Sequence, residues 1–173
     1  MSAAATSALP PALPADAPLA RRIASLAYEA MILCALLLIA GFVTLPLVPP
    51  GGEVLRIPDA PARALSLAVI FGASAAYFVV SWSNGRRTLP MKTWHIGLVR
   101  RDGGIVDRRT AFTRYLCGWI GPALALAGYF ALRPAGAGPW ALVLLAFNFL
   151  WGFADPDRQF LHDRMAGTRL IER

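Results

Sequence analysis

The sequence predicts an all-α membrane protein: a four-helix transmembrane bundle with a basic cytoplasmic loop between helices 2 and 3 and a short C-terminal cytoplasmic helix. Two observations support this. Of the 173 residues, 57% are hydrophobic, whereas soluble domains are about 45–50% apolar, and the excess lies in runs long enough to cross a bilayer. The basic residues cluster where these runs end, which is the pattern that holds a segment in the cytoplasm.

Four apolar runs provide the predicted spans, which cover residues 23–48, 64–82, 112–132 and 139–154. Pro49-Pro50-Gly51-Gly52 ends the first run, because such a sequence breaks helices. In the second run, small residues at Ala64, Ala68, Gly72 and Ala76 predict a face that packs closely on another helix. The fourth run is short and reaches only about 24 Å as an α-helix.

The third and fourth runs contain residues that bear on helix packing. Pro122 predicts a kink, which membrane helices tolerate when a neighbour takes up the freed carbonyl group. Gly121 and Ala125 lie on a second face of small residues. Arg114, at the edge of the third run, is expected to extend toward the head groups. Asn148, in the middle of the fourth run, is predicted to hydrogen-bond between helices.

The net charge of +7 comes from basic residues next to the apolar runs. Of 17 basic residues, 14 fall in three clusters, at 21–22, 86–114 and 158–173. With four spans, this distribution places both chain ends in the cytoplasm. It predicts contact with anionic lipid head groups at the cytoplasmic face, and it argues against a nucleic-acid partner, which a basic chain can otherwise suggest.

Outside the spans, the domain organisation is simple. Residues 1–20 are rich in alanine and proline and are predicted to be a disordered cytoplasmic tail, followed by one transmembrane domain over 21–173. In the basic loop, alternating apolar residues over 94–99 before Asp102-Gly103-Gly104 predict a short strand and a turn. A segment lying on the membrane surface is the alternative, so the conformation of 86–111 stays open. Asp155-Pro156 predicts the start of the C-terminal helix, and Gly167 its end.

Glu29 is the most informative single residue. It lies seven residues after Arg22, two helical turns deeper and on nearly the same face. A charged group at the centre of the bilayer costs about 2–3 kcal/mol even on the milder insertion scales. The sequence therefore predicts that a cation, water or protonation compensates Glu29.

No catalytic or metal-binding pattern is found. His162 lies beside Asp163, but no serine or cysteine nucleophile occupies a recognisable motif, so an enzymatic activity is not expected. Cys34 and Cys117 lie far apart in apolar runs and have no histidine or cysteine neighbours at ligand spacing. No metal and no cofactor are predicted.

Three segments resemble the RDD family of membrane proteins, which is named for an arginine and an aspartate in the first span and a second aspartate near the C-terminus. They are Arg22 with Glu29; Gly-Arg-Arg-Thr-Leu-Pro-Met-Lys-Thr-Trp-His-Ile-Gly-Leu at 85–98 with Arg-Asp-Gly-Gly at 101–104; and Leu-His-Asp-Arg-Met-Ala-Gly-Thr at 161–168. The last segment is the most specific. Together the segments cover nearly the whole chain apart from the tail.

The resemblance implies roles for individual residues. Arg22 corresponds to the family's arginine and Asp163 to its second aspartate. Glu29 stands where the family usually has aspartate, which keeps the charge and adds one methylene. Pro90 stands where the family often has a small glycine. A bacterial inner membrane is the implied location, and the family has no settled activity, although transport is a frequent suggestion.

Two functional hypotheses follow. Arg22, Glu29 and Asp163 are expected to meet near the cytoplasmic boundary, with His162, Arg164 and Asn148 supporting them. In one hypothesis the intramembrane carboxylate serves ion or small-solute transport; because four short spans are few for a transporter, the chain would then form a homo-oligomer. In the other, the chain is a non-transporting structural or accessory subunit that binds another membrane protein.

Overall fold

The structure, a computed structural model, describes residues 14–44 and 60–173. Three predicted parts lie outside the described residues: residues 1–13 of the tail, residues 45–48 of the first span, and the Pro49-Pro50-Gly51-Gly52 sequence that ends it. The predicted tail is too long at its C-terminal end, since Asp16 pairs with Ile171 in a β-bridge and Ala17 is buried.

The described chain is mostly helical. Its elements are α1 (Leu19–Thr44), α2 (Ala60–Trp82), α3 (Leu89–Thr93), β1 (Ile96–Arg100), α4 (Arg108–Gly118), α5 (Ile120–Leu132), η2 (Arg133–Ala135), η3 (Gly138–Ala146), α6 (Phe147–Ala154), α7 (Leu161–Ala166) and β2 (Thr168–Glu172). Among these residues, three stretches are long and apolar enough to cross a membrane: Leu19–Ile39, Arg63–Trp82 and Arg108–Ala135. The fourth apolar stretch, Gly138–Ala154, is shorter.

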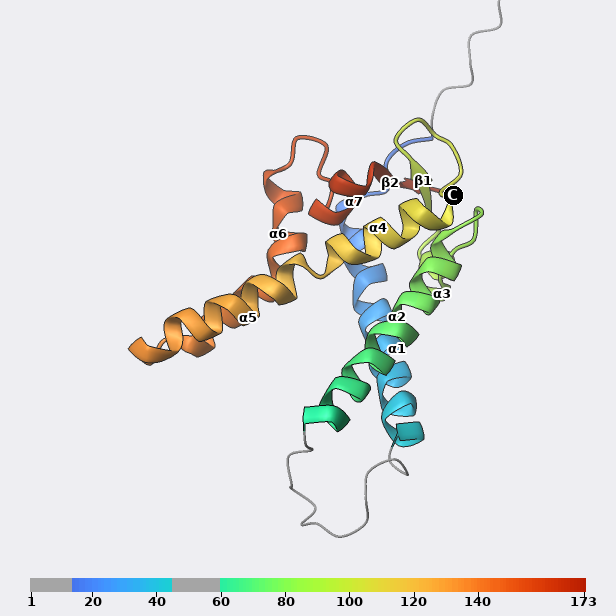
Figure 1. Cartoon of the computed structure of the whole chain (residues 1–173). Helices are drawn as coiled ribbons and strands as arrows, with labels where there is room; N and C mark the ends of the chain where they lie inside the picture. The colour runs from blue at the N-terminus through green and yellow to red at the C-terminus, as the bar shows by residue number, and fades with distance from the viewer. Residues whose placement is uncertain (1–13, 45–59) are drawn as a thin grey trace, which may run out of the picture.

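The helices do not form one four-helix bundle. α1 packs on α2, α5 packs on η3, and the two pairs diverge from α4, which joins them at one end of the molecule (Figure 1). The small face of α2 does not pack within the described chain, because Ala64, Ala68, Gly72 and Ala76 are all exposed. On α5 the small face is packed: Gly121 and Ala125 are buried.

The break between α4 and α5 confirms the predicted kink. Proline 122 has no N–H to donate to the carbonyl four residues earlier, that of Gly118. Asn148 Nδ2 of α6 donates to this carbonyl at 2.8 Å and to that of Cys117 at 3.2 Å. Asn148 is 1% exposed, so a buried side chain from the fourth apolar stretch stabilises the kink. The kink and an interhelical hydrogen bond from Asn148 were each predicted, whereas their connection is seen only in the structure.

The fourth apolar stretch gains length from its conformation. Gly138–Ala146 is a 3-10 helix, and only Phe147–Ala154 is α-helical. A 3-10 helix rises about 2.0 Å per residue against about 1.5 Å in an α-helix. The stretch therefore has a contour length of about 30 Å, close to the hydrocarbon thickness of a bilayer.

A small antiparallel sheet lies at the end of the molecule where α3 and α7 are found, here called the sheet end (Figure 1). β1 confirms the predicted strand, so the alternative of a membrane-surface segment is wrong for these residues. Leu98 of β1 faces Leu170 of β2, and both are buried. The all-α prediction is wrong in that β1 pairs with a second strand, β2, which was not predicted.

The residues after α6 differ from the prediction. Asp155 does not begin a helix: its Oδ1 accepts hydrogen bonds from the backbone N–H of Asp157 and Gln159, at 2.9 and 3.3 Å, and closes a turn. The last helix, α7, begins at Leu161 instead. Its end at Gly167 is confirmed, because this glycine has a φ of 65° and reverses the chain into β2.

Candidate functional site

The buried ion pair between Asp163 and Arg114 is the centre of the candidate site. Asp163 of α7 is 0% exposed, and its Oδ1 accepts a hydrogen bond from Arg114 Nε at 2.6 Å. The hydroxyl of Thr168 donates to the same oxygen at 3.0 Å, which the chain reversal at Gly167 makes possible. Burial acts to raise the pKa of Asp163, but Arg114 and the Thr168 hydrogen bond outweigh it and hold this pKa below its ordinary value.

Arg114 is held on three sides. Its guanidinium carbon lies 4.0 Å from the centroid of the Trp82 ring, a cation–π contact. Its Nη2 lies 3.2 Å from Nε2 of His162. Burial lowers the pKa of His162 to about 4, and the charge of Arg114 acts in the same direction. A neutral imidazole can accept the hydrogen bond from Arg114, so His162 serves as a polar, uncharged neighbour of the ion pair.

Arg22 of α1 is 3% exposed and binds backbone groups of the C-terminal segment. Its Nη1 donates to the carbonyl of Arg158 at 2.9 Å, and its Nη2 to that of Leu170 at 3.5 Å. Asp163 lies within electrostatic range of the guanidinium but makes no ion pair with it. Arg22 therefore ties the start of the first helix to the chain around α7.

Glu29 differs from the other buried charges. It is 8% exposed, and neither carboxylate oxygen has a hydrogen bond from any described residue. Thr88, at the start of α3, and Arg114 are close enough to act on its charge, although the Thr88 hydroxyl falls short of hydrogen-bond geometry. Tyr77 of α2 is also within electrostatic range, and its buried hydroxyl has no partner in the described chain. Glu29 and Tyr77 therefore both keep buried oxygens that have no hydrogen-bond partner in the described chain.

A model of the RDD family matches residues 17–167. The chain belongs to the RDD family. Searches of curated proteins and of solved structures found no match. The matched region contains Arg22, Glu29 and Asp163, the residues that led to the resemblance, and the membrane helices, so this RDD protein is an integral membrane protein.

In this RDD protein the three expected site residues are all buried at or near the sheet end, but they do not pair as expected. Arg22 was expected to neutralise one or both carboxylates, whereas Arg114 is the cation bonded to Asp163 and the one that acts on Glu29. The expectation that Arg114 extends to the head groups is wrong, since its side chain is 4% exposed. Its position as the one basic residue within the third predicted span was the signal that could have identified it.

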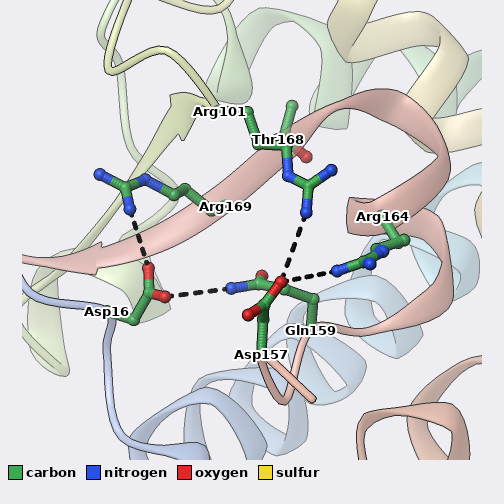
Figure 2. Close-up of a pocket in the computed structure, with 7 residues that line it drawn as sticks. All are labelled: Asp16, Arg101, Asp157, Gln159, Arg164, Thr168 and Arg169. Carbon is green, nitrogen blue, oxygen red and sulfur yellow. Dashed lines mark hydrogen bonds and ion pairs between the residues drawn. The ribbon is translucent and has the colours of Figure 1, made fainter. Parts of the chain in front are cut away.

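The supporting residues divide into two groups. His162 belongs to the site through Arg114. Arg164 does not: it forms ion pairs with Asp155 at 3.5 Å and with Asp157 at 2.7 Å. Figure 2 shows the pair with Asp157. Asn148 stabilises the kink. Within residues 14–44 and 60–173, no group of three histidine, cysteine or carboxylate residues could hold a metal ion.

Proposed function

We propose that this RDD protein binds and releases a small cation, a proton or a monovalent metal ion, at Glu29, and that this exchange is part of an ion-transport activity. The observation behind the proposal is the buried carboxylate with two unpartnered oxygens. Buried polar groups in proteins are almost always hydrogen-bonded, and an ionisable group within a membrane segment is a functional candidate for that reason.

The surroundings of Glu29 support a cation as the missing partner. The neighbouring hydroxyl groups of Tyr77 and Thr88 offer oxygen atoms as ligands, and hard cations prefer oxygen ligands. The nearby cation, Arg114, is already bonded to Asp163. Arg114 is therefore not bonded to Glu29, whose carboxylate oxygens have no hydrogen-bond partner in the described chain.

Ion flux in reconstituted liposomes tests the proposal. We expect the wild type to conduct protons or alkali cations above the level of empty vesicles, and Glu29→Gln to abolish this flux while preserving the fold. Glu172→Gln is the matched control, because it makes the same change at a half-exposed carboxylate of β2 that pairs with Arg21. Absence of flux from the wild type, or full flux in Glu29→Gln, would contradict the transport proposal.

We also propose a bacterial inner-membrane location with the sheet end in the cytoplasm. Two of the basic clusters flank this end, and the backbone of Ala17 hydrogen-bonds to Leu170 at 2.9 Å, so the described N-terminal residues lie beside the C-terminal strand. The chain crosses the membrane an even number of times if η3 and α6 return through the bilayer along α5.

Cysteine labelling tests this location. In a cysteine-free background, Gly136→Cys should react with an impermeant maleimide from outside the cell, and Arg173→Cys should react only after lysis.

An accessory role is the second candidate. The exposed small face of α2 favours it: a Cβ added at Gly72 would meet no atom within 4 Å, so this face is open to a helix of another membrane protein. In this case a defined partner should co-purify with the wild type from native membranes and be lost with Gly72→Leu. Recovery of the partner with Gly72→Leu would argue against this surface.

A further inference from the structure

A hollow of about 180 Å³ lies at the sheet end and is lined by polar and charged side chains, three of them arginines and two of them aspartates. Figure 2 shows the side chains of Arg101, Arg164 and Arg169 arranged around it, with Asp16 and Asp157 between them. We call this the rim hollow. Its lining includes Thr168, which also donates to Asp163 of the buried ion pair, but not Glu29, Tyr77 or Thr88.

The carboxylates of the rim hollow do not saturate its guanidinium groups. Arg101 and Arg164 share one oxygen, Oδ2 of Asp157, at 3.3 and 2.7 Å, and Arg164 also pairs with Asp155 at 3.5 Å. Arg169 reaches Asp16 only at 3.7 Å, and its buried Nε and Nη2 have no acceptor among the described residues. Unpaired buried donors of this kind require an acceptor, and guanidinium groups match the oxygens of phosphate in geometry and charge.

The neighbourhood adds positive charge. A second hollow, of about 330 Å³, adjoins the first and shares Asp16 and Asp157 with it. Arg22 and Arg158 line this second hollow, and the exposed side chain of Arg158 forms no ion pair with a described residue. Taken together, basic groups outnumber acidic ones around the two hollows.

With the apolar stretches placed across a bilayer, the rim hollow would lie near the level of the lipid head groups. Asp16 lies three residues before Leu19, where the first candidate membrane span begins, and Asp157 lies three residues after Ala154, where the last apolar stretch ends. A few residues of chain place both carboxylates within about 10 Å of the hydrophobic boundary. Phosphate groups of lipids occupy this depth on each side of a bilayer.

We propose that the rim hollow binds a phosphate group, either the head-group phosphate of an anionic lipid or a soluble phosphate. The phosphate oxygens pair with the guanidinium groups that line the hollow, those of Arg101, Arg164 and Arg169. They also compete with Asp157 for Arg101 and Arg164. Binding therefore weakens when salt screens the charges.

Two probes distinguish the sources of phosphate: phosphatidic acid in phosphatidylcholine nanodiscs, counted by native mass spectrometry, and inorganic phosphate, titrated by calorimetry on the full chain. Arg169→Gln should weaken binding roughly tenfold, as expected for the loss of a charge-assisted hydrogen bond. Asp157→Asn should strengthen binding severalfold, because it removes the competing carboxylate. This opposite sign separates a binding effect from loss of folding in Arg169→Gln.

The matched controls make the same charge changes outside the hollow. They are Arg109→Gln, an exposed arginine of α4, and Asp102→Asn, an exposed aspartate in the turn after β1. Binding of both probes supports a site for the phosphate group itself, and binding of phosphatidic acid alone supports a head-group site. The proposal is overturned if neither probe binds saturably, or if the controls change affinity as much as the hollow variants do.

Discussion

Removing the charge of Asp163 should destabilise the protein strongly, because it leaves a buried cation without its partner. In Asp163→Asn, Arg114 keeps its 4% exposure and loses the carboxylate at 2.6 Å. The neutral His162 and the Trp82 ring remain, but neither carries a negative charge. Arg114→Met is the reciprocal change and leaves Asp163 buried and uncompensated.

The size of the effect follows from the geometry. With about 4 Å between charge centres and an effective dielectric constant near 20, Coulomb's law gives about 4 kcal/mol for the pair. Breaking buried pairs by removing one partner costs about 3–5 kcal/mol, in agreement with this figure. In the double variant neither charge remains, so its cost should be less than the sum of the single costs by about 2 kcal/mol or more.

Equilibrium unfolding in mixed micelles measures these free energies for the wild type, the two single variants and the double variant. Asp102→Asn is the control, because it removes a carboxylate from the exposed pair with Arg100 and should change stability little. The interpretation that Arg114 and Asp163 stabilise each other directly would be refuted by either of two results. One is that Asp163→Asn loses no more unfolding free energy than Asp102→Asn does, and the other is that the effects of the single variants add in the double variant.

Three further predictions concern pH and packing. The pKa of His162 is about 4 in the folded state and about 6.5 in an unfolded chain, so the unfolded state binds more protons between these two pH values. The free energy of unfolding should therefore fall by up to about 3 kcal/mol as pH drops from 6.5 to 4, and His162→Phe should flatten this dependence on pH. Asn148→Leu should cost about 1–3 kcal/mol in unfolding free energy by leaving a buried carbonyl unpaired, and less in a Pro122→Ala background, which restores an N–H donor for it. Gly121→Ala should lower the thermal midpoint, since its Cβ would lie 2.8 Å from a backbone oxygen, whereas Gly72→Ala, which meets open space, should leave it unchanged or raise it.

The membrane helices were the most predictable part of the fold. Their hydrophobic runs are local features, and the kink at Pro122 followed from the missing N–H of proline. The interhelical hydrogen bond of Asn148 followed from the cost of a polar side chain in lipid, but only the structure shows that its acceptor is the carbonyl freed by the kink. The strand at 96–100 was readable from alternation. Its partner β2 was not, because five residues after a glycine carry little signal until they meet a second strand.

The arrangement of the helices was not predictable in the same way. Small residues at Gly121 and at Gly72 give equal local evidence for close packing, yet the first is buried against η3 and the second is exposed. Lipid tails are as apolar as the helices themselves, so hydrophobicity does not determine which helix pairs with which.

By itself, the sequence determined that this chain is an RDD-type membrane protein, and it singled out Arg22, Glu29 and Asp163, because hydrophobic length, charge placement and family motifs are properties of neighbouring residues. Only the structure showed that Arg22 and Asp163 are buried as well. The tertiary structure decided how those charges are compensated. Arg114 and Asp163 are 49 positions apart, and only the fold brings them together. The tertiary structure also leaves Glu29 buried without a hydrogen-bond partner among the described residues. The sequence could not show this, because any hydrogen-bond partner of Glu29 would have to come from other helices.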